Sequence, residues 1–129
     1  MPNVRALIID DNFNNVRVLE QLLQVENIET VRLLQTANLS HELDTMQHID
    51  VVFLDLEMPG MNGYDALNMI KAHSNFRSTQ VVAYSVHVGE LNNALDMGFD
   101  GFLGKPLSSE VFPSQLQRIL GGEKVWYLP

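Results

Sequence analysis

The sequence contains no cysteine, which excludes a disulfide framework and any metal site built on thiolates. It also lacks a long hydrophobic run. The apolar residues 6–9 suffice only for a strand, whereas a membrane-spanning helix needs about 18 apolar residues. No basic segment followed by a long apolar run marks the N-terminus, so we predict neither export nor membrane insertion. We expect a cytoplasmic protein with no membrane partner.

Positive charge is scarce. Lysine and arginine together number 8 against 16 acidic residues, which gives a net charge of −8. The few basic residues form no run. Nonspecific nucleic-acid binding depends on lysine and arginine to neutralise phosphates. The composition therefore argues against direct contact with nucleic acid.

Apolar runs of strand length alternate with amphipathic helical patterns along the 129 residues. The clearest run, residues 51–54, is typical of a strand buried on both faces of a parallel sheet. The other predicted strands are residues 4–9, 28–34, 80–84 and 99–103. Helices are predicted after Asn12, over 41–47, from Gly63, over 89–97, and from Ser108 or Ser109 to Leu120.

Five strand–helix units in strict alternation indicate an α/β fold, a doubly wound parallel sheet with helices on both faces. The length and the absence of a linker predict one domain over residues 1–120. Residues 121–129 are expected to form a C-terminal tail with no output domain. We expect Trp126, the single tryptophan, to pack back onto the domain, the alternative being a docking or dimer surface.

Chemically distinctive residues follow four of the predicted strands. They are Asp10 and Asp11, Asp55, Ser85, and Lys105. A parallel sheet places the carboxyl ends of its strands at one edge, where ligands bind. Each residue alone could be a helix cap or a solvated loop residue, but the five together indicate a site.

Three aspartates and one lysine carry a net charge of −2, which is costly at close range unless a cation joins them. Mg²⁺ suits the site because it prefers oxygen ligands and is held by carboxylates, waters and phosphate oxygens. Such a site can accept a phosphoryl group, with the Asp55 carboxylate as nucleophile. Lys105 would pair with Asp55 and then with the phosphoryl group, and Ser85 would donate a hydrogen bond to it.

These residues, with the segments 51–63 and 101–106, resemble the receiver domain of two-component response regulators, the CheY-like family. The resemblance covers residues 4–120 and implies a flavodoxin-like (βα)5 fold with a five-stranded parallel sheet in the order 2-1-3-4-5. It implies Mg²⁺ bound by Asp11, Asp55 and the backbone carbonyl of Glu57, with Asp10 supporting through water. It also implies a cis Lys105–Pro106 peptide bond.

The resemblance further implies a switch. The Ser85 hydroxyl moves toward the phosphoryl group and Phe102 turns inward, which remodels the surface of the fourth helix, fifth strand and fifth helix. Glu57 and His87 flank the path of the attacking water and tune the aspartyl-phosphate lifetime. Val86 stands where a small residue is usual and is expected to slow phosphoryl exchange. Pro59 and Gly63 shape the turn that follows Asp55.

The resemblance implies a single-domain response regulator whose Asp55 receives a phosphoryl group from a histidine kinase or a histidine phosphotransfer protein. The protein would act through a downstream target protein, as a monomer or weak dimer. It is expected to be no enzyme beyond its own phosphoryl acceptance and hydrolysis. The alternatives are a non-phosphorylated scaffold, a phosphatase of the haloacid-dehalogenase type, a flavin carrier, and a receiver excised from a hybrid kinase.

Overall fold

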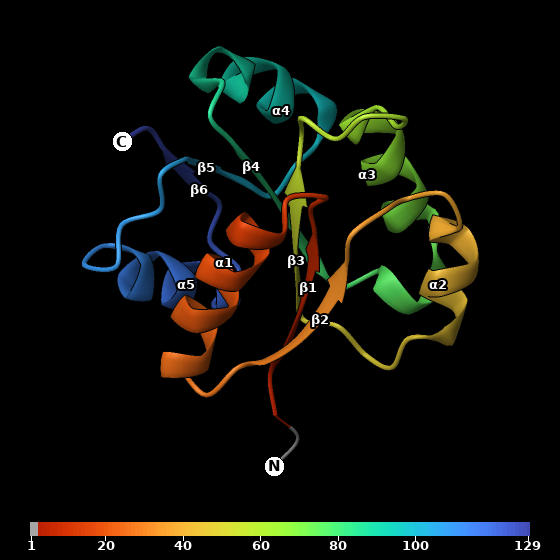
Figure 1. Cartoon of the computed structure of the whole chain (residues 1–129), viewed down its shortest axis with the longest axis horizontal. Coiled ribbons are helices and arrows are strands. Elements are labelled where there is room, and N and C mark those ends of the chain that lie inside the picture. The colour runs from red at the N-terminus through yellow and green to blue at the C-terminus, as the bar shows by residue number, and fades with distance from the viewer. Residues whose placement is uncertain (1–2) are drawn as a thin grey trace.

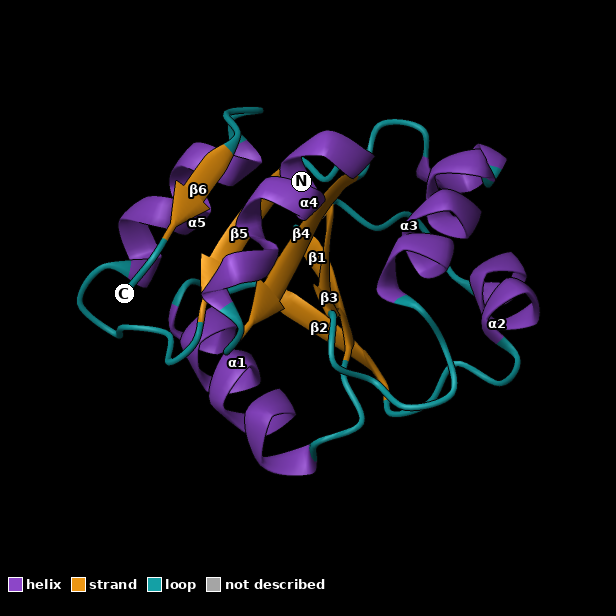
Figure 2. Ribbon diagram, turned by 90° about the horizontal axis from the view of Figure 1, so that it is seen from above, coloured by secondary structure: helices purple, strands orange, loops and turns teal. Residues whose placement is uncertain are grey.

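The computed structural model describes residues 3–129 as a parallel sheet between two layers of helices. The sheet has the order β2-β1-β3-β4-β5-β6 (Figures 1 and 2). Its strands are β1 (Arg5–Ile9), β2 (Glu29–Leu33), β3 (Val51–Asp55), β4 (Gln80–Ser85), β5 (Gly101–Gly104) and β6 (Val125–Tyr127). The predicted α/β class and the order of the first five strands are confirmed.

Five α-helices and two short 3-10 helices connect the strands. They are α1 (Phe13–Val25), α2 (Leu39–Thr45), α3 (Gly63–Ala72), η1 (Ser74–Phe76), η2 (Val88–Glu90), α4 (Leu91–Met97) and α5 (Phe112–Leu120). Asn12 caps α1 as predicted, because its side chain accepts a hydrogen bond from the backbone N–H of Asn15. Asn62 caps α3 in the same way through Tyr64 N–H. Both caps follow loops that leave the carboxyl edge of the sheet.

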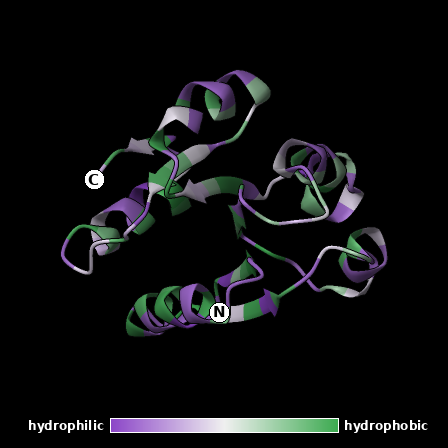
Figure 3. Cartoon of the chain, turned by 45° about the horizontal axis from the view of Figure 1, so that its top comes forward, coloured by the Kyte–Doolittle hydropathy of each residue, from purple (hydrophilic) through white to green (hydrophobic). Residues whose placement is uncertain are grey.

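Two hydrophobic clusters lie on opposite faces of the sheet. One contains buried residues of α1 and α5, such as Leu19 and Leu116. The other contains residues of α2, α3 and α4, such as Leu43, Ile70 and Ala94. Figure 3 shows hydrophobic colour concentrated in the central strands and mixed hydropathy around the helices. The sheet is therefore covered on both faces, and the site residues emerge only at its edge.

The sixth strand corrects the prediction of a five-stranded sheet. Residues of the expected tail pair in parallel with β5, with Gly101 opposite Val125, Phe102 opposite Trp126 and Leu103 opposite Tyr127. A side chain at Gly101 would lie 2.9 Å from the Val125 carbonyl oxygen. A three-residue strand after two glycines carries no periodicity, so its existence depends on the edge that β5 offers.

No helix within residues 3–129 is both long enough and apolar enough to cross a membrane.

Candidate functional site

Three carboxylates meet at the carboxyl edge of the sheet. Asp10, Asp11 and Asp55 each present an oxygen within 4.8 Å of the other two. Asp10 and Asp55 are buried, while Asp11 is exposed. β1 and β3 are neighbours, with Ile9 paired to Leu54, so their next residues meet. The structure therefore brings together the predicted acidic residues.

Backbone amides hold two of these carboxylates in place. Asp10 Oδ1 accepts a hydrogen bond from Asn12 N–H at 2.9 Å, and Asp55 Oδ1 accepts one from Glu57 N–H at 3.0 Å. The loop after Asp55 then enters α3 at Gly63, where an added Cβ would lie 2.8 Å from Leu56 Cδ2. The loop therefore runs close to the start of α3, and the Glu57 N–H holds the Asp55 carboxylate in place.

Lys105 supplies the positive charge of the site. Its ammonium lies 3.6 Å from Asp10 Oδ2 and 3.6 Å from Asp55 Oδ1, and its side chain is 11% exposed. The Lys105 N–H donates to the Ser85 carbonyl oxygen at 2.8 Å. The Lys105–Pro106 peptide bond is cis, as the resemblance implies. The lysine thus lies between two carboxylates and is screened from bulk water.

The negative charges outnumber this single cation, and the pKa values reflect it. Burial raises the pKa of Asp10, and burial together with the neighbouring Glu57 carboxylate raises the pKa of Asp55. Burial opposes ionisation of Glu57, but the neighbouring Asp55 carboxyl and the hydrogen bond from the Ser85 hydroxyl lower its pKa. An ionised oxygen cluster with excess negative charge fits a hard divalent cation such as Mg²⁺.

This charge excess predicts a pH-dependent stability difference between the wild-type protein and Asp55→Asn. The pKa of Asp55 is higher in the folded protein than its value of about 3.8 in the unfolded chain. The free energy of unfolding therefore falls as the pH rises from 3.8 to the folded pKa, because ionised Asp55 destabilises the folded state. In EDTA, Asp55→Asn should therefore be more stable than wild type near neutral pH. The gain should shrink as the pH falls toward 4. Urea unfolding at several pH values measures the difference in free energy of unfolding between the two proteins. A difference that does not change with pH would contradict the prediction.

The Ser85 hydroxyl already has two hydrogen-bond partners. This buried hydroxyl donates to the Glu57 carboxylate and accepts from His87 N–H at 2.9 Å. His87 Nε2 lies 3.9 Å from Glu57 Oε1. The residues predicted to tune phosphoryl lifetime therefore form one chain of contacts with Ser85. Any phosphoryl oxygen that takes the Ser85 hydrogen bond must displace Glu57.

Tyr84 belongs to the site, although the sequence analysis did not include it. Its hydroxyl donates to Asp10 Oδ2 at 2.6 Å, and its ring centroid lies 4.3 Å from the Lys105 ammonium. Burial and the bond to Asp10 raise the pKa of Tyr84, so its hydroxyl remains a donor. In an apolar strand a tyrosine is easily taken for a core residue. The available signal was that a buried tyrosine hydroxyl usually finds a partner.

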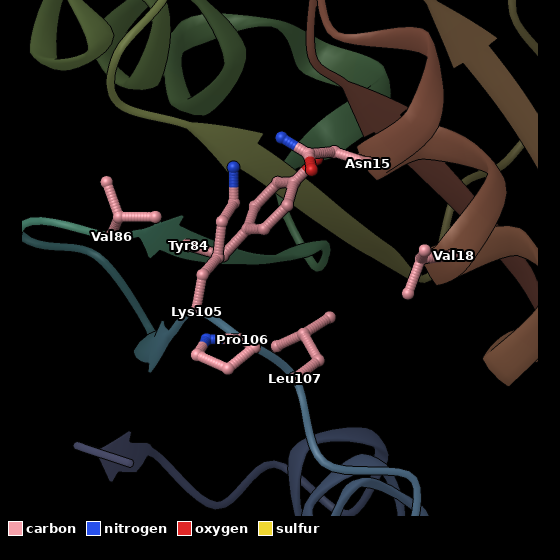
Figure 4. Close-up of a pocket in the computed structure, with 7 residues that line it drawn as sticks. All are labelled: Asn15, Val18, Tyr84, Val86, Lys105, Pro106 and Leu107. Atoms are coloured by element: carbon pink, nitrogen blue, oxygen red, sulfur yellow. The ribbon is translucent and has the colours of Figure 1, made fainter.

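A groove of about 310 Å³ leads from the surface to Lys105. Figure 4 shows its lining, with Lys105 beside the Tyr84 ring and Val86, Pro106 and Leu107 around them. Asn15 and Val18 of α1 complete the groove. Val86 is 58% exposed at this rim, so its side chain stands at the approach to the site rather than in the core.

Phe102 is already buried, with no exposed surface. The resemblance implies that this aromatic turns inward on phosphorylation, and the inward position is the one that the structure shows. The half-buried Trp126 of β6 pairs with it on β5 and packs against the same hydrophobic cluster. Phe102 is therefore inward in this structure, and its rotation on phosphorylation stays a prediction.

A family model described as response regulator receiver domain matches residues 6–117. Among curated proteins, the chain is 32% identical over 111 residues to stress response regulator protein 1 of Candida tropicalis, covering 84% of this chain and 42% of that protein. It is 31% identical over 110 residues to protein PilG of Pseudomonas aeruginosa, covering 83% of this chain and 80% of PilG. The chain spans less than two thirds of the length of several curated relatives.

Solved structures share the fold. The receiver domain of the sensor histidine kinase PA1611 from Pseudomonas aeruginosa has a TM-score of 0.80 at 24% identity, covering 93% of this chain and 99% of that one. That structure has a magnesium ion coordinated in its active site cleft. The chemotaxis response regulator CheY4 of Vibrio cholerae also has a TM-score of 0.80, at 20% identity, covering 92% and 99% of the two chains. Both likenesses extend over nearly the whole chain.

Proposed function

The chain belongs to the response regulator receiver domain family, and on this premise we propose that it is a phosphorelay receiver whose Asp55 accepts the phosphoryl group. The observation that carries the proposal is the position of the Asp55 carboxylate. It ends a buried strand, has two other carboxylates within 4.8 Å, and lies 3.6 Å from a screened ammonium. Mg²⁺ bound by Asp11, Asp55 and the Glu57 carbonyl, with Asp10 in support, would offset the charge of the incoming phosphoryl group.

The proposed reaction transfers a phosphoryl group from a phosphohistidine to Asp55. The P–N bond breaks and a P–O bond to a carboxylate oxygen of Asp55 forms. The electron pair stays on the imidazole nitrogen, which takes up a proton. Lys105 lies close enough to follow the negative charge from the carboxylate to the phosphoryl oxygens. Hydrolysis by water later releases inorganic phosphate and restores Asp55, and Glu57, Val86 and His87 are proposed to tune its rate.

The partner that donates the phosphoryl group is proposed to be a histidine kinase or a histidine phosphotransfer protein. The apolar groove beside Lys105, with the exposed Val18 and Val86 at its rim, offers such a partner a surface next to Asp55. We propose that the exchange takes place in the cytoplasm, where ATP is available for histidine phosphorylation. Family membership argues against the haloacid-dehalogenase and flavin alternatives, while the scaffold alternative is decided by the experiment below.

We propose that the surface recognised by a downstream protein includes β6. Phosphoryl binding would draw the Ser85 hydroxyl from Glu57, which shifts the β4–η2 connection beside α4. In this chain the edge of β5 is covered by β6, with Trp126 opposite Phe102. A downstream protein would therefore contact α4, β6 and α5 rather than an open β5 edge.

The decisive experiment is incubation with Mg²⁺ and acetyl phosphate or phosphoramidate, followed by intact-mass measurement. We expect the wild-type protein to gain the mass of one phosphoryl group and Asp55→Asn to gain none. Asp96→Asn, which removes an exposed carboxylate of α4, is the matched control and should gain as wild type does. No gain by the wild-type protein with either donor would favour the scaffold.

A further inference from the structure

We propose that Tyr84 is a positioning residue of the acceptor site, which fixes Asp10 with its hydroxyl and the Lys105 ammonium with its ring. The inference deepens the proposed function and rests on it. It concerns a residue of β4 that lies directly opposite Asp55 in the strand register. One side chain therefore contacts the groups on either side of the phosphoryl acceptor.

The hydroxyl completes the fixation of Asp10. This carboxylate has no exposed surface, and its Oδ1 accepts from Asn12 N–H at 2.9 Å. Its Oδ2 accepts the Tyr84 hydroxyl at 2.6 Å. One donor on each oxygen holds the Asp10 carboxylate in a single orientation. This orientation also sets the direction of the lone pairs that remain for other partners. Partners that orient a metal-site carboxylate in this way strengthen metal binding, and their loss typically costs 10- to 100-fold in affinity or activity.

The ring fixes the lysine. The Lys105 ammonium lies 4.3 Å from the Tyr84 ring centroid and 3.6 Å from each of two carboxylates. Figure 4 shows the lysine side chain running beside the ring. A lysine side chain is flexible, and an aromatic face attracts the ammonium and narrows its positions. An aliphatic residue would fill the same space but could neither donate to Asp10 nor face a cation.

The two contacts can be separated by substitution. Tyr84→Phe removes the hydroxyl and keeps the ring, whereas Tyr84→Leu removes both. Calorimetric titration with MgCl₂, without any phosphodonor, should show an approximately 10-fold higher Kd for Tyr84→Phe. Acetyl phosphate labelling at varied Mg²⁺ should show a raised half-saturating Mg²⁺ concentration with a near wild-type maximal rate. Tyr84→Leu should also lower that maximal rate about 10-fold.

Tyr64→Phe is the matched control, because the Tyr64 hydroxyl also donates to a carboxylate, that of Glu90 at 2.5 Å, which does not belong to the aspartate cluster. Its Kd for Mg²⁺ should stay within about twofold of wild type. In an Asp10→Asn background, Tyr84→Phe should have no further effect on Mg²⁺ binding. Circular dichroism establishes that each variant is folded at the titration temperature.

An unchanged or lower Kd in Tyr84→Phe, or an undiminished effect in the Asp10→Asn background, would overturn the inference. So would a wild-type protein that binds no Mg²⁺. The calorimetric measurement involves no phosphoryl transfer. Absence of labelling in every variant would therefore count against the proposed function and leave the Tyr84 measurement intact.

Discussion

Lys105→Met is expected to slow phosphoryl acceptance by Asp55 about 100- to 1000-fold, the usual loss when one fixed donor to a developing negative charge is removed. The substitution keeps most of the side-chain volume and removes the ammonium that lies 3.6 Å from the acceptor oxygen. No other lysine or arginine forms an ion pair with Asp55 among the described residues. The rate of mass gain from acetyl phosphate at saturating Mg²⁺ measures the effect.

The same variant should bind Mg²⁺ several-fold more tightly than wild type, because an ammonium that repels the cation is gone. Slow labelling combined with tighter metal binding identifies a folded site that lacks a charge. Lys124→Met is the matched control, since Lys124 is exposed in the α5–β6 connection, and it should leave both quantities unchanged. A labelling rate within tenfold of wild type would show that Lys105 does not stabilise the transferred group.

Ending the chain after Glu123, which removes β6, is expected to lower the free energy of unfolding by about 2 to 4 kcal/mol. The deletion takes away the buried Val125 and the half-buried Trp126 and Tyr127, which pack against the two clusters. It also leaves β5 as an edge with unpaired backbone groups. Urea unfolding measures the loss, and hydrogen exchange of the β5 amides should become faster.

Leu128→Ala controls for a general effect of the C-terminus, because Leu128 follows β6 and is 51% exposed. Its free energy of unfolding should stay within about 0.5 kcal/mol of wild type. The truncated protein should expose Phe102 and change its response to phosphorylation, since the aromatic can then leave the core. Unaltered stability and unaltered exchange of β5 would mean that β6 is not bound to the sheet in solution.

Local patterns in the sequence determined the fold class and the location of the acidic site. The apolar run before Asp55 is typical of a doubly buried strand, and alternation of such runs with amphipathic helices implies a parallel sheet. In a parallel sheet the residues that follow the strands must meet at one edge. The proximity of Asp10, Asp11 and Asp55 to Lys105 therefore follows from chain order and strand direction alone.

Tertiary structure alone decided three features of the protein. From the sequence Tyr84 looks like a core residue of its strand, and only the strand order, in which β3 lies between β1 and β4, lets its hydroxyl reach Asp10. The sequence gives Ser85 no evident partner, but in the fold its hydroxyl donates a hydrogen bond to the Glu57 carboxylate. Residues 125–127 have no periodicity of their own and become a strand only because β5 presents an open edge. Such contacts join residues distant in sequence, so no local pattern encodes them.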